Sequence, residues 1–235
     1  HRINHIISAH EQGAVHAADG YARVNGKTGV VIATSGPGAT NLVTGIANAY
    51  LDSVPLVAIT GNVAVPLLGK DSFQEVDIVG ITQPIVKHNF VVRDVNDLSA
   101  TIKEAFYIAS SGRKGPVLID IPKTVQIADC EYTDTPIEVK NYHTKPENDY
   151  LAALTAIKES KKPYIYCGGG VIASEAQNEV LELSKRLSAP IGLSMMGLTA
   201  IPNSYELNLG MCGMHGKYSA SKAQSEADLL IAVGV

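Results

Sequence analysis

The chain has 235 residues, of which 46% are hydrophobic and 18% are charged, and its net charge is −4. This composition is typical of one large or two ordinary globular domains, and it excludes a disordered chain. With no long basic run and no apolar stretch of ~20 residues, we expect neither a nucleic-acid partner nor a membrane partner. The cysteines are odd in number and widely spaced (Cys130, Cys167 and Cys212), which favours a reducing, intracellular setting over a disulfide framework or a zinc site.

The first part of the chain predicts a strand followed by a helix, with Glu11 at the junction. His5–Ala9 is an apolar run of strand length, and small or apolar residues at positions 14, 15, 18 and 22 recur at helical spacing before Gly26. The simplest interpretation is that Glu11 caps the helix, since carboxylates suit a helix N-terminus. The functional hypothesis is that near-apolar surroundings raise its pKa and let it exchange a proton near neutrality.

A zinc site at Glu11 is the third interpretation of this stretch. His10 and His16 lie on either side of the glutamate. The zincin pattern, however, needs two histidines one helical turn apart that flank the glutamate, and the second histidine here lies beyond that turn. The spacing therefore excludes this type of zinc site.

Up to Pro122 the sequence alternates between strands and helices. Strands are predicted at Gly29–Ser35, Pro55–Thr60 and Gly115–Pro122, and helices at Leu42–Tyr50 and Leu98–Ser110. The run Gly29–Ser35 is continuously apolar, which predicts burial on both faces of a parallel sheet. Residues 63–87 form a long irregular segment, of a kind that is more often functional than idle. Repeated strand–helix units predict an α/β fold, with a parallel sheet flanked by helices.

A second α/β domain is predicted after a charged segment that contains Pro and Thr. This segment, residues 128–148, is the expected linker between a first domain (1–127) and a second domain (149–235). The later elements are helices at Leu151–Glu159 and Ser174–Leu187, and strands at Pro163–Cys167, Pro190–Leu193 and Leu229–Val235. Because apolar strands stand at both raw ends of the sequence, we expect a piece of a longer protein.

Two glycine-rich loops follow predicted strands. Gly36–Asn41 opens a helix, and its N–H groups could hold a phosphate, but a tight turn that contacts a flat ligand fits at least as well. The second loop, Gly168–Ala173, fits the dinucleotide pattern G-x-G-x-x-A. It lacks an acidic residue roughly twenty residues further on, so a plain tight turn stays an equal alternative.

Taken together, the motifs resemble those of one family. HEQGAVHAADGYAR, TSGPGATNLVTGIANAY, DSFQE, GPVLIDIPK, GGGVI, MMGL and GMHG occur in this order and resemble the large, catalytic subunit of acetohydroxyacid (acetolactate) synthases. The resemblance implies a thiamine-diphosphate pyrimidine-binding domain that lacks its first elements. A truncated, Rossmann-like domain that binds FAD would follow. The third domain of that family, which holds the diphosphate and Mg²⁺, would lie outside this chain, so no metal ligand is expected within it.

The resemblance also implies roles for individual residues. Glu11 would hydrogen-bond the pyrimidine N1′ and, with Gln74 and Lys123, form the catalytic set. Pro37 and Asn41 would contact the pyrimidine, and Gln74 the reactive end of the cofactor. Phe73 and Lys123 would border the substrate channel. The residues implied to contact FAD are Arg113, Gly168, Gly169, Gly170, Ser194, Met195, Met196, Gly213, Met214, His215 and Gly216. On this basis the loop Gly36–Gly38 meets a ring and not a phosphate. Ala64 and Cys212 depart from the family pattern, which usually has proline and leucine there.

The activity implied is that of a transferase in branched-chain amino-acid (valine and isoleucine) biosynthesis. Pyruvate is decarboxylated and joined to a second 2-oxoacid, which gives 2-acetolactate or 2-aceto-2-hydroxybutyrate. The family forms homodimers or tetramers with the active site between subunits, and some members bind a small regulatory subunit. The expected location is the cytoplasm of a bacterium, or a plastid if the source is a plant. The chain by itself is expected to be inactive.

Several alternatives remain. Pyruvate oxidase, oxalyl-CoA decarboxylase and the flavin-free catabolic acetolactate synthase belong to the same superfamily, but DSFQE with GGGVI and GMHG favours the flavin-containing biosynthetic form. Glyoxylate carboligase is disfavoured because it lacks a glutamate at the position of Glu11. A nucleotide-binding module without catalysis would explain the GGG turn, but it leaves HEQGA and DSFQE without a role.

Overall fold

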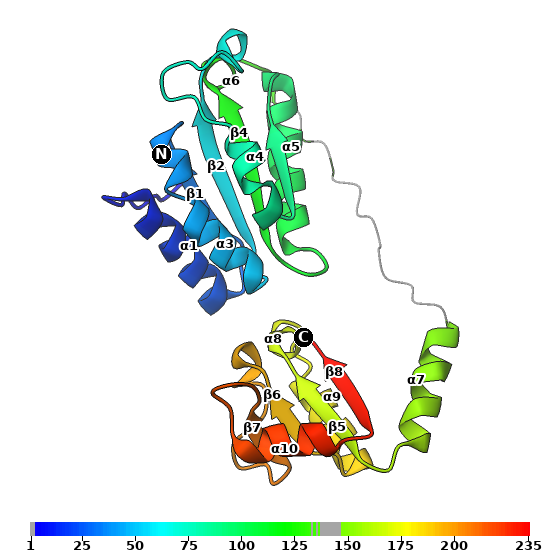
Figure 1. Cartoon of the computed structure of the whole chain (residues 1–235). Helices are drawn as coiled ribbons and strands as arrows, with labels where there is room; N and C mark the ends of the chain where they lie inside the picture. Colours follow the sequence, from blue (N-terminus) through cyan, green and yellow to red (C-terminus); the bar gives the residue numbers. More distant parts are fainter. Residues whose placement is uncertain (1–2, 133, 135, 137–146) are drawn as a thin grey trace. The chain divides into compact units, whose positions relative to one another are not determined.

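The computed structural model describes residues 3–132, 134, 136 and 147–235, and it separates into two compact units, His1–Tyr142 and His143–Val235 (Figure 1). The division between the units falls within residues 128–148, the segment predicted as a linker. Much of that segment lies outside the described residues. Each unit is an α/β layer structure and is described by itself.

The first unit is built on a four-stranded parallel sheet with the order β1-β2-β4-β3. This agrees with the predicted fold class, because the strand–helix alternation required parallel strands with crossover connections. Its elements in chain order are α1 (Glu11–Asn25), β1 (Gly29–Ala33), α2 (Pro37–Thr40), α3 (Val43–Leu51), β2 (Leu56–Asn62), η1 (Val65–Leu67), α4 (Ile78–Thr82), η2 (Gln83–Ile85), β3 (His88–Val91), α5 (Val95–Ser110), β4 (Pro116–Pro122) and α6 (Lys123–Gln126).

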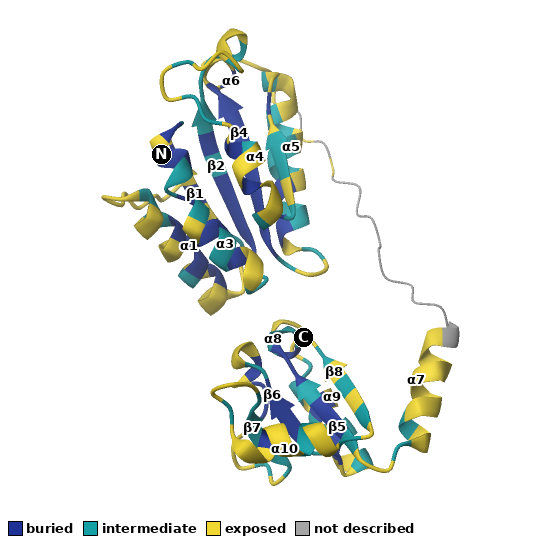
Figure 2. Cartoon of the chain, viewed as in Figure 1, coloured by how far each residue is buried: buried dark blue, intermediate teal, exposed yellow. Residues whose placement is uncertain are grey.

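Helices cover both faces of the central strands. On one face, Val15 of α1 and Ile46 of α3 belong to a core with Leu118 of β4. On the other face, Ala105 of α5 belongs to a core with Ile119 of the same strand. Successive residues of β4 therefore point to opposite layers, and the whole strand is buried (Figure 2).

The strand β1 differs from the expectation for Gly29–Ser35. The predicted burial on both faces is wrong, because Val30 and Ile32 are 44% and 72% exposed while Gly29, Val31 and Ala33, which alternate with them, are buried. The reason is position: β1 is an edge strand among the described residues, and the core on the α5 side includes no residue of β1. An apolar run predicted a strand correctly, but its burial depended on neighbours far away in the sequence.

The second unit holds a second parallel sheet, with the order β7-β6-β5-β8. Its core gathers Ile165, Ile191 and Leu193 with Val171 and Val180 from the helices. The elements are α7 (Glu147–Glu159), β5 (Pro163–Cys167), α8 (Gly169–Ala173), α9 (Gln177–Leu187), β6 (Ile191–Leu193), η3 (Met195–Gly197), β7 (Asn208–Met211), α10 (Tyr218–Glu226) and β8 (Leu229–Val233). None of the helices among the described residues of the chain is both long and apolar enough to cross a bilayer.

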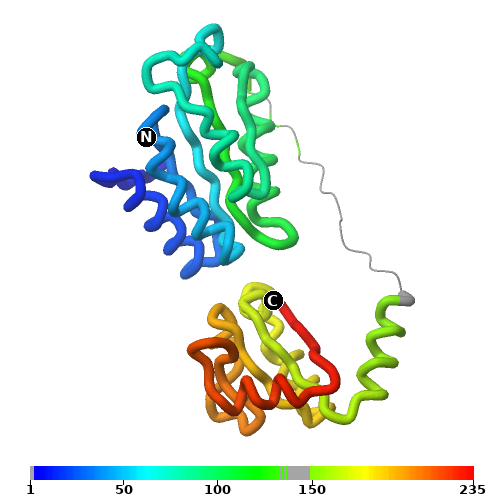
Figure 3. The backbone as a smooth tube through the Cα atoms, viewed as in Figure 1, coloured from blue at the N-terminus to red at the C-terminus, as the bar shows by residue number. Residues whose placement is uncertain are grey.

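One predicted element is wrong, and another begins too early. The expected strand His5–Ala9 belongs to no helix or strand, and Ile6 and Ile7 are 98% and 86% exposed, because no described strand pairs with them. The expected helix Ser174–Leu187 is found as α9, which starts three residues later because Glu175 adopts a left-handed conformation (φ 56°). The strands β3 and β7 and the helices α4, α6, α8 and α10 were not predicted. Figure 3 follows the chain through these elements.

Candidate functional site

The helix α1 begins at Glu11, and its sequence explains both of its ends. His10 is extended (φ −143°) and its Nδ1 accepts a hydrogen bond from the Gln12 backbone N–H at 3.1 Å, so His10 is the N-cap. At the other end Gly26 takes the left-handed conformation (φ 66°) typical of a helix C-terminus. The N-cap is therefore His10 and not Glu11. Glu11 still stands in the first turn, where a carboxylate suits the helix N-terminus, and its carboxylate also makes contacts outside the helix.

The loop after β1 brings two residues to the Glu11 carboxylate. Asn41 Nδ2 donates a hydrogen bond to Glu11 Oε2 at 3.0 Å. A Cβ on Gly38 would lie 3.3 Å from Glu11 Oε1 and only 2.7 Å from Thr34 Cγ2. Glycine at this position thus allows the loop to approach the carboxylate. Gly36, with a φ of 62°, makes the turn that starts this approach.

The pKa of Glu11 is lowered, which contradicts the raised pKa predicted from its sequence neighbours. The hydrogen bond from Asn41 is the largest cause, followed by a hydrogen bond from the backbone N–H of Glu11 itself. Desolvation acts in the opposite direction but is smaller. The prediction failed because it counted apolar neighbours in the sequence, whereas the deciding donor comes from the loop after β1. Glu11 is consequently an anionic hydrogen-bond acceptor at neutral pH.

The DSFQE segment meets the same loop from another direction. A Cβ on Gly36 would lie 2.8 Å from Gln74 O and 3.0 Å from Gln74 Cα, so the two backbones are in contact. Gln74 has a positive φ of 57°, and the Phe73 side chain is 88% exposed. The structure therefore brings together Glu11, Asn41 and Gln74, three of the predicted site residues, with the exposed Pro37 on the loop between them.

The phosphate interpretation of Gly36–Gly38 is wrong. The helix that follows, α2, has only four residues, and its glycine-rich start lies against the anionic carboxylate of Glu11. A phosphate there would meet a like charge, which is unfavourable. The geometry fits the alternative, a tight turn beside a flat ligand.

Lys123 lies at the carboxyl end of a sheet strand, as does the loop that follows β1. It is the first residue of α6, directly after Pro122, which pairs with Asn62 at the carboxyl end of β2. Ligands of open α/β sheets bind outside the carboxyl ends of the strands, so this is the edge where a site is expected. The side chain of Lys123 is exposed.

A buried carboxylate nearby was missed by sequence reasoning. Asp120 in β4 is 1% exposed, and it accepts hydrogen bonds from Thr60 Oγ1 at 2.7 Å and from Asn62 Nδ2 at 2.5 Å. Burial raises the pKa of Asp120, and these two hydrogen bonds oppose that effect. Asn62 Oδ1 in turn accepts from the Val63 backbone N–H, which fixes the start of the segment that carries Gln74. The signal was visible as the lone charge within the apolar run GPVLIDIP.

In the second unit, the residues implied to contact FAD lie in the loops after β5, β6 and β7. These loops share the carboxyl edge of the second sheet, because its strands are parallel. Met195, Met196 and Met214 are 63%, 41% and 95% exposed, and Ser194 Oγ accepts from the Gly197 N–H at 3.1 Å. His215 is exposed as well. The exposed thioether side chains give this edge an apolar surface.

The glycines at 168–170 do not form a phosphate cradle. The N–H groups of Gly168 and Gly170 donate to Val233 O at 2.9 Å and to Gly234 O at 2.8 Å. A Cβ on Gly168 would lie 2.2 Å from Gly234 O, so glycine is required for the two chain segments to cross. Two of the N–H groups of the dinucleotide pattern are therefore engaged by the chain itself, which favours the tight-turn alternative.

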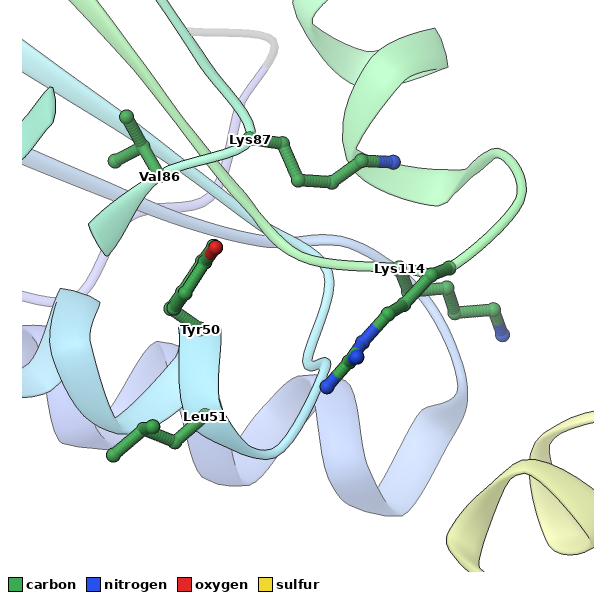
Figure 4. A pocket seen from close by; sticks show the side chains of 6 residues that line it. Tyr50, Leu51, Val86, Lys87 and Lys114 are labelled. Atoms are coloured by element: carbon green, nitrogen blue, oxygen red, sulfur yellow. The ribbon is translucent and has the colours of Figure 1, made fainter. Parts of the chain in front are cut away.

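Arg113 lies in the first unit, away from Glu11. Arg113 precedes β4, whereas Lys123 follows that strand, so Arg113 lies near the amino end of β4 and Lys123 at its carboxyl end. Its Nε donates to Ser53 Oγ at 2.8 Å. It lines a pocket of about 400 Å³ with Tyr50, Leu51, Val86, Lys87 and Lys114 (Figure 4). Burial lowers the pKa of Lys87, whose ammonium group donates to the carbonyls of Ile108 and Ser111 near the end of α5.

Comparison with known proteins decides the family. Residues 1–81 match the model of the thiamine pyrophosphate enzyme N-terminal TPP binding domain, and residues 151–235 match that of the thiamine pyrophosphate enzyme central domain. The chain belongs to the thiamine pyrophosphate enzymes. Glu11, Asn41 and Gln74 lie within the first match, whereas Arg113 and Lys123 lie outside both. Thiamine pyrophosphate is another name for thiamine diphosphate, so this cofactor class agrees with the prediction.

The similar proteins are acetolactate synthases, which confirms the predicted resemblance. The chain is 51% identical to the acetolactate synthase large subunit of Corynebacterium glutamicum, over 99% of the chain and 38% of the relative. The acetolactate synthase of Mycobacterium leprae is likewise 51% identical, with the same coverage. The large subunit of Buchnera aphidicola is 44% identical, over 99% of the chain and 42% of the relative. The chain thus spans about two fifths of the length of these relatives.

Proposed function

We propose that the chain is part of an acetolactate synthase large subunit. The whole protein would use thiamine diphosphate to decarboxylate pyruvate and to join the remaining two-carbon unit to a second 2-oxoacid. The observation that carries this proposal is the anionic carboxylate of Glu11, which Asn41 holds beside Gly38 in a chain 44–51% identical to acetolactate synthases.

The residues at Glu11 suit an aminopyrimidine ring. Asn41 occupies Oε2 of the carboxylate, which leaves Oε1 beside Gly38 to accept a hydrogen bond from a ring nitrogen. Gly36 and Gly38 present backbone only, so a flat ring can approach them. When bound, thiamine diphosphate supplies the electron sink that decarboxylation of a 2-oxoacid requires.

Each of the proposed site residues would have a separate role. Glu11, ionised at neutral pH, holds a proton on the ring nitrogen that faces it and keeps the ring in one orientation. Asn41 fixes the carboxylate, Pro37 borders the ring, and Gln74 reaches toward the reactive end. Lys123 and the exposed Phe73 border the path of the substrate, where a cation attracts the carboxylate of a 2-oxoacid.

FAD and Mg²⁺ complete the proposed cofactor set. Ligands for Mg²⁺ and the diphosphate would come from outside these residues. The second unit suits a flavin through its exposed methionines, because apolar side chains pack well on a flat ring system. Because the N–H groups of Gly168 and Gly170 are engaged by Val233 and Gly234, these glycines would offer FAD mainly a flat backbone surface. The pocket at Arg113 supports a separate contact with an anionic part of FAD.

The assembly proposed is a homodimer or tetramer with the active site between subunits, to which a small regulatory subunit can bind. The non-catalytic alternative has lost its main support. It depended on a nucleotide bound at the GGG turn, and two N–H groups of that turn are already engaged by the chain itself.

An assay on the full-length protein tests the proposal. With thiamine diphosphate, Mg²⁺ and FAD, pyruvate should yield acetolactate, measured as acetoin after acid treatment, and added 2-oxobutyrate should yield the mixed product. Oxygen uptake with acetyl phosphate formation would instead identify a pyruvate oxidase. Absence of any condensation product with all three cofactors present would refute the synthase assignment.

A further inference from the structure

The segment between η1 and α4 is closed by the side chain of Glu75. Its Oε1 accepts a hydrogen bond from the Gly69 backbone N–H, and its Oε2 accepts from Ser72 N at 2.8 Å and Lys70 N at 3.3 Å. The Glu75 N–H also donates to Ser72 O at 2.9 Å. One carboxylate therefore ties together the whole loop 69–75.

The backbone of this loop has an unfavourable conformation, which the hydrogen bonds to Glu75 stabilise. Gly69, Asp71 and Gln74 have φ values of 74°, 52° and 57°. Only glycine adopts this region without steric cost, so two of the three residues are held in an unfavourable conformation. Successive N–H groups that converge in such a turn form a concave anion site, and the carboxylate of Glu75 fills it. Hydrogen bonds from these N–H groups lower the pKa of Glu75, so the carboxylate is ionised at neutral pH.

The far side of the loop rests on the site at Glu11. The Gln74 backbone contacts Gly36, two residues before Gly38, which faces the Glu11 carboxylate. The near side is joined to two short helices, since Ser72 Oγ donates to Leu67 O of η1 at 3.2 Å, and Val65 N of η1 donates to Thr124 Oγ1 of α6 at 3.1 Å. The Glu75 carboxylate points back into its own loop and so cannot contact the ring itself.

We infer that Glu75 is a positioning residue of the thiamine diphosphate site and acts through Gln74. By holding the loop 69–75 closed, its carboxylate fixes the left-handed backbone of Gln74 against Gly36 and thereby aims the Gln74 side chain. This inference rests on the proposed function for the contact between Gln74 and the cofactor. The closure of the loop by Glu75 does not depend on that function.

The first test is Glu75→Gln in the full-length protein, with Glu104→Gln as the matched control. Glutamine keeps the size of the side chain but turns one acceptor group into a donor, so the N–H groups of the loop cannot all be satisfied. We expect kcat/KM for pyruvate to fall roughly ten- to hundredfold, in line with small misplacements in other sites. The control changes an exposed glutamate of α5 and should leave kcat/KM unchanged.

A double-mutant cycle separates positioning from a general structural role. If Glu75 acts through Gln74, then Glu75→Gln should add little further loss of kcat/KM in a Gln74→Ala background. If the two losses multiply as independent effects, the inference is overturned.

Hydrogen exchange gives a readout that does not depend on activity. In the protein without added cofactor, Glu75→Gln should lower the protection of the Gly69 and Ser72 amides, while Glu104→Gln should not. Calorimetric titration with thiamine diphosphate should then show weaker binding for Glu75→Gln. Lost protection with unchanged binding and unchanged kcat/KM would overturn the positioning role. Lost protection in a protein that makes no acetolactate would instead count against the proposed function alone.

Discussion

Two glycine-rich loops that look alike in sequence differ in what their glycines accommodate. In the first unit, a Cβ on Gly36 or Gly38 would meet residues of the proposed site, namely Gln74 or Glu11 with its neighbour Thr34. In the second unit, a Cβ on Gly168 or Gly170 would meet the backbone of Gly234, while one on Gly169 would meet Met196. The glycines of the first loop thus lie against groups of the proposed thiamine diphosphate site, whereas Gly168 and Gly170 allow two segments of the chain to cross.

This difference has a general lesson for glycine motifs. Both loops follow a strand and open a short helix, so their local sequence contexts are equivalent. Their roles are set by partners that lie far away in the sequence, and those partners become visible only in the folded chain. Substitutions of Gly36 or Gly38 should therefore affect the binding and reaction of thiamine diphosphate, whereas a substitution of Gly168 should affect stability.

The largest effect is expected for Glu11→Gln in the full-length protein. This substitution removes the negative charge at position 11 but keeps the size and shape of the side chain, so the rate of acetolactate formation should fall by about 10²–10⁴. The circular dichroism spectrum should be unchanged, because the side chain is not the N-cap of α1 and belongs to no core cluster, and the thermal midpoint should fall only slightly, through the weaker hydrogen bond with Asn41. Glu104→Gln is the control. Near-normal turnover of Glu11→Gln at saturating cofactor would mean that this carboxylate is not the functional group.

Gly38→Ala should have the next largest effect. The added methyl group would lie 2.7 Å from Thr34 Cγ2 and 3.3 Å from Glu11 Oε1, so the carboxylate or the loop must move. We expect kcat/KM to fall roughly tenfold or more, because small displacements of an aligned group are costly. Gly20→Ala is the matched control, since a Cβ there meets nothing within 4 Å. Equal kinetics for the two alanine variants would remove the distinction between the loops.

Gly168→Ala should show the opposite signature. Its Cβ would lie 2.2 Å from Gly234 O, and overpacking of this type destabilises a protein by about 1–3 kcal/mol. The thermal midpoint should therefore fall, while the affinity for thiamine diphosphate, measured by calorimetric titration, should stay the same. A variant with weaker thiamine diphosphate binding and an unchanged midpoint would contradict the role assigned to this turn.

The fold class was predictable because both sheets consist mainly of short apolar runs separated by helical periodicity. The missed strands are those without this signal: β3 has the sequence HNFV and is partly exposed, and β7 begins Asn-Leu-Gly and carries a register shift beside β6. The false strand His5–Ala9 shows the converse. An apolar run becomes a strand only when a neighbour can satisfy its backbone N–H and C=O groups.

For the candidate site, the proximity of three predicted residues could be anticipated, but their electrostatics could not. Glu11, Asn41 and Gln74 came from the family resemblance of the motifs, and the structure brings them together. The pKa of Glu11 was predicted in the wrong direction, because Asn41 lies on a different element. Asp120 and the loop-closing role of Glu75 were missed for the same reason, since their hydrogen-bond partners are set by the fold and not by the local pattern.

The smallest effect is expected for Asn41→Ala, and it concerns pH. Asn41 is the main cause of the lowered pKa of Glu11, so its loss should move that pKa up toward the ordinary value. A carboxylate whose pKa is lowered on folding stabilises the folded state above its unfolded pKa, and this stabilisation is lost as the pH falls through the folded pKa. In Asn41→Ala, the acidic limb of the kcat/KM profile should therefore shift to higher pH, while the rate near neutrality changes less than in Glu11→Gln. A ¹³C titration of labelled glutamate, with Glu11→Gln to assign the signal, would check the shift directly. If neither the acidic limb nor the carboxyl signal moved, Asn41 would not control the charge on Glu11. The two glycine-rich loops would then differ only in which groups their glycines accommodate, and not in their electrostatics.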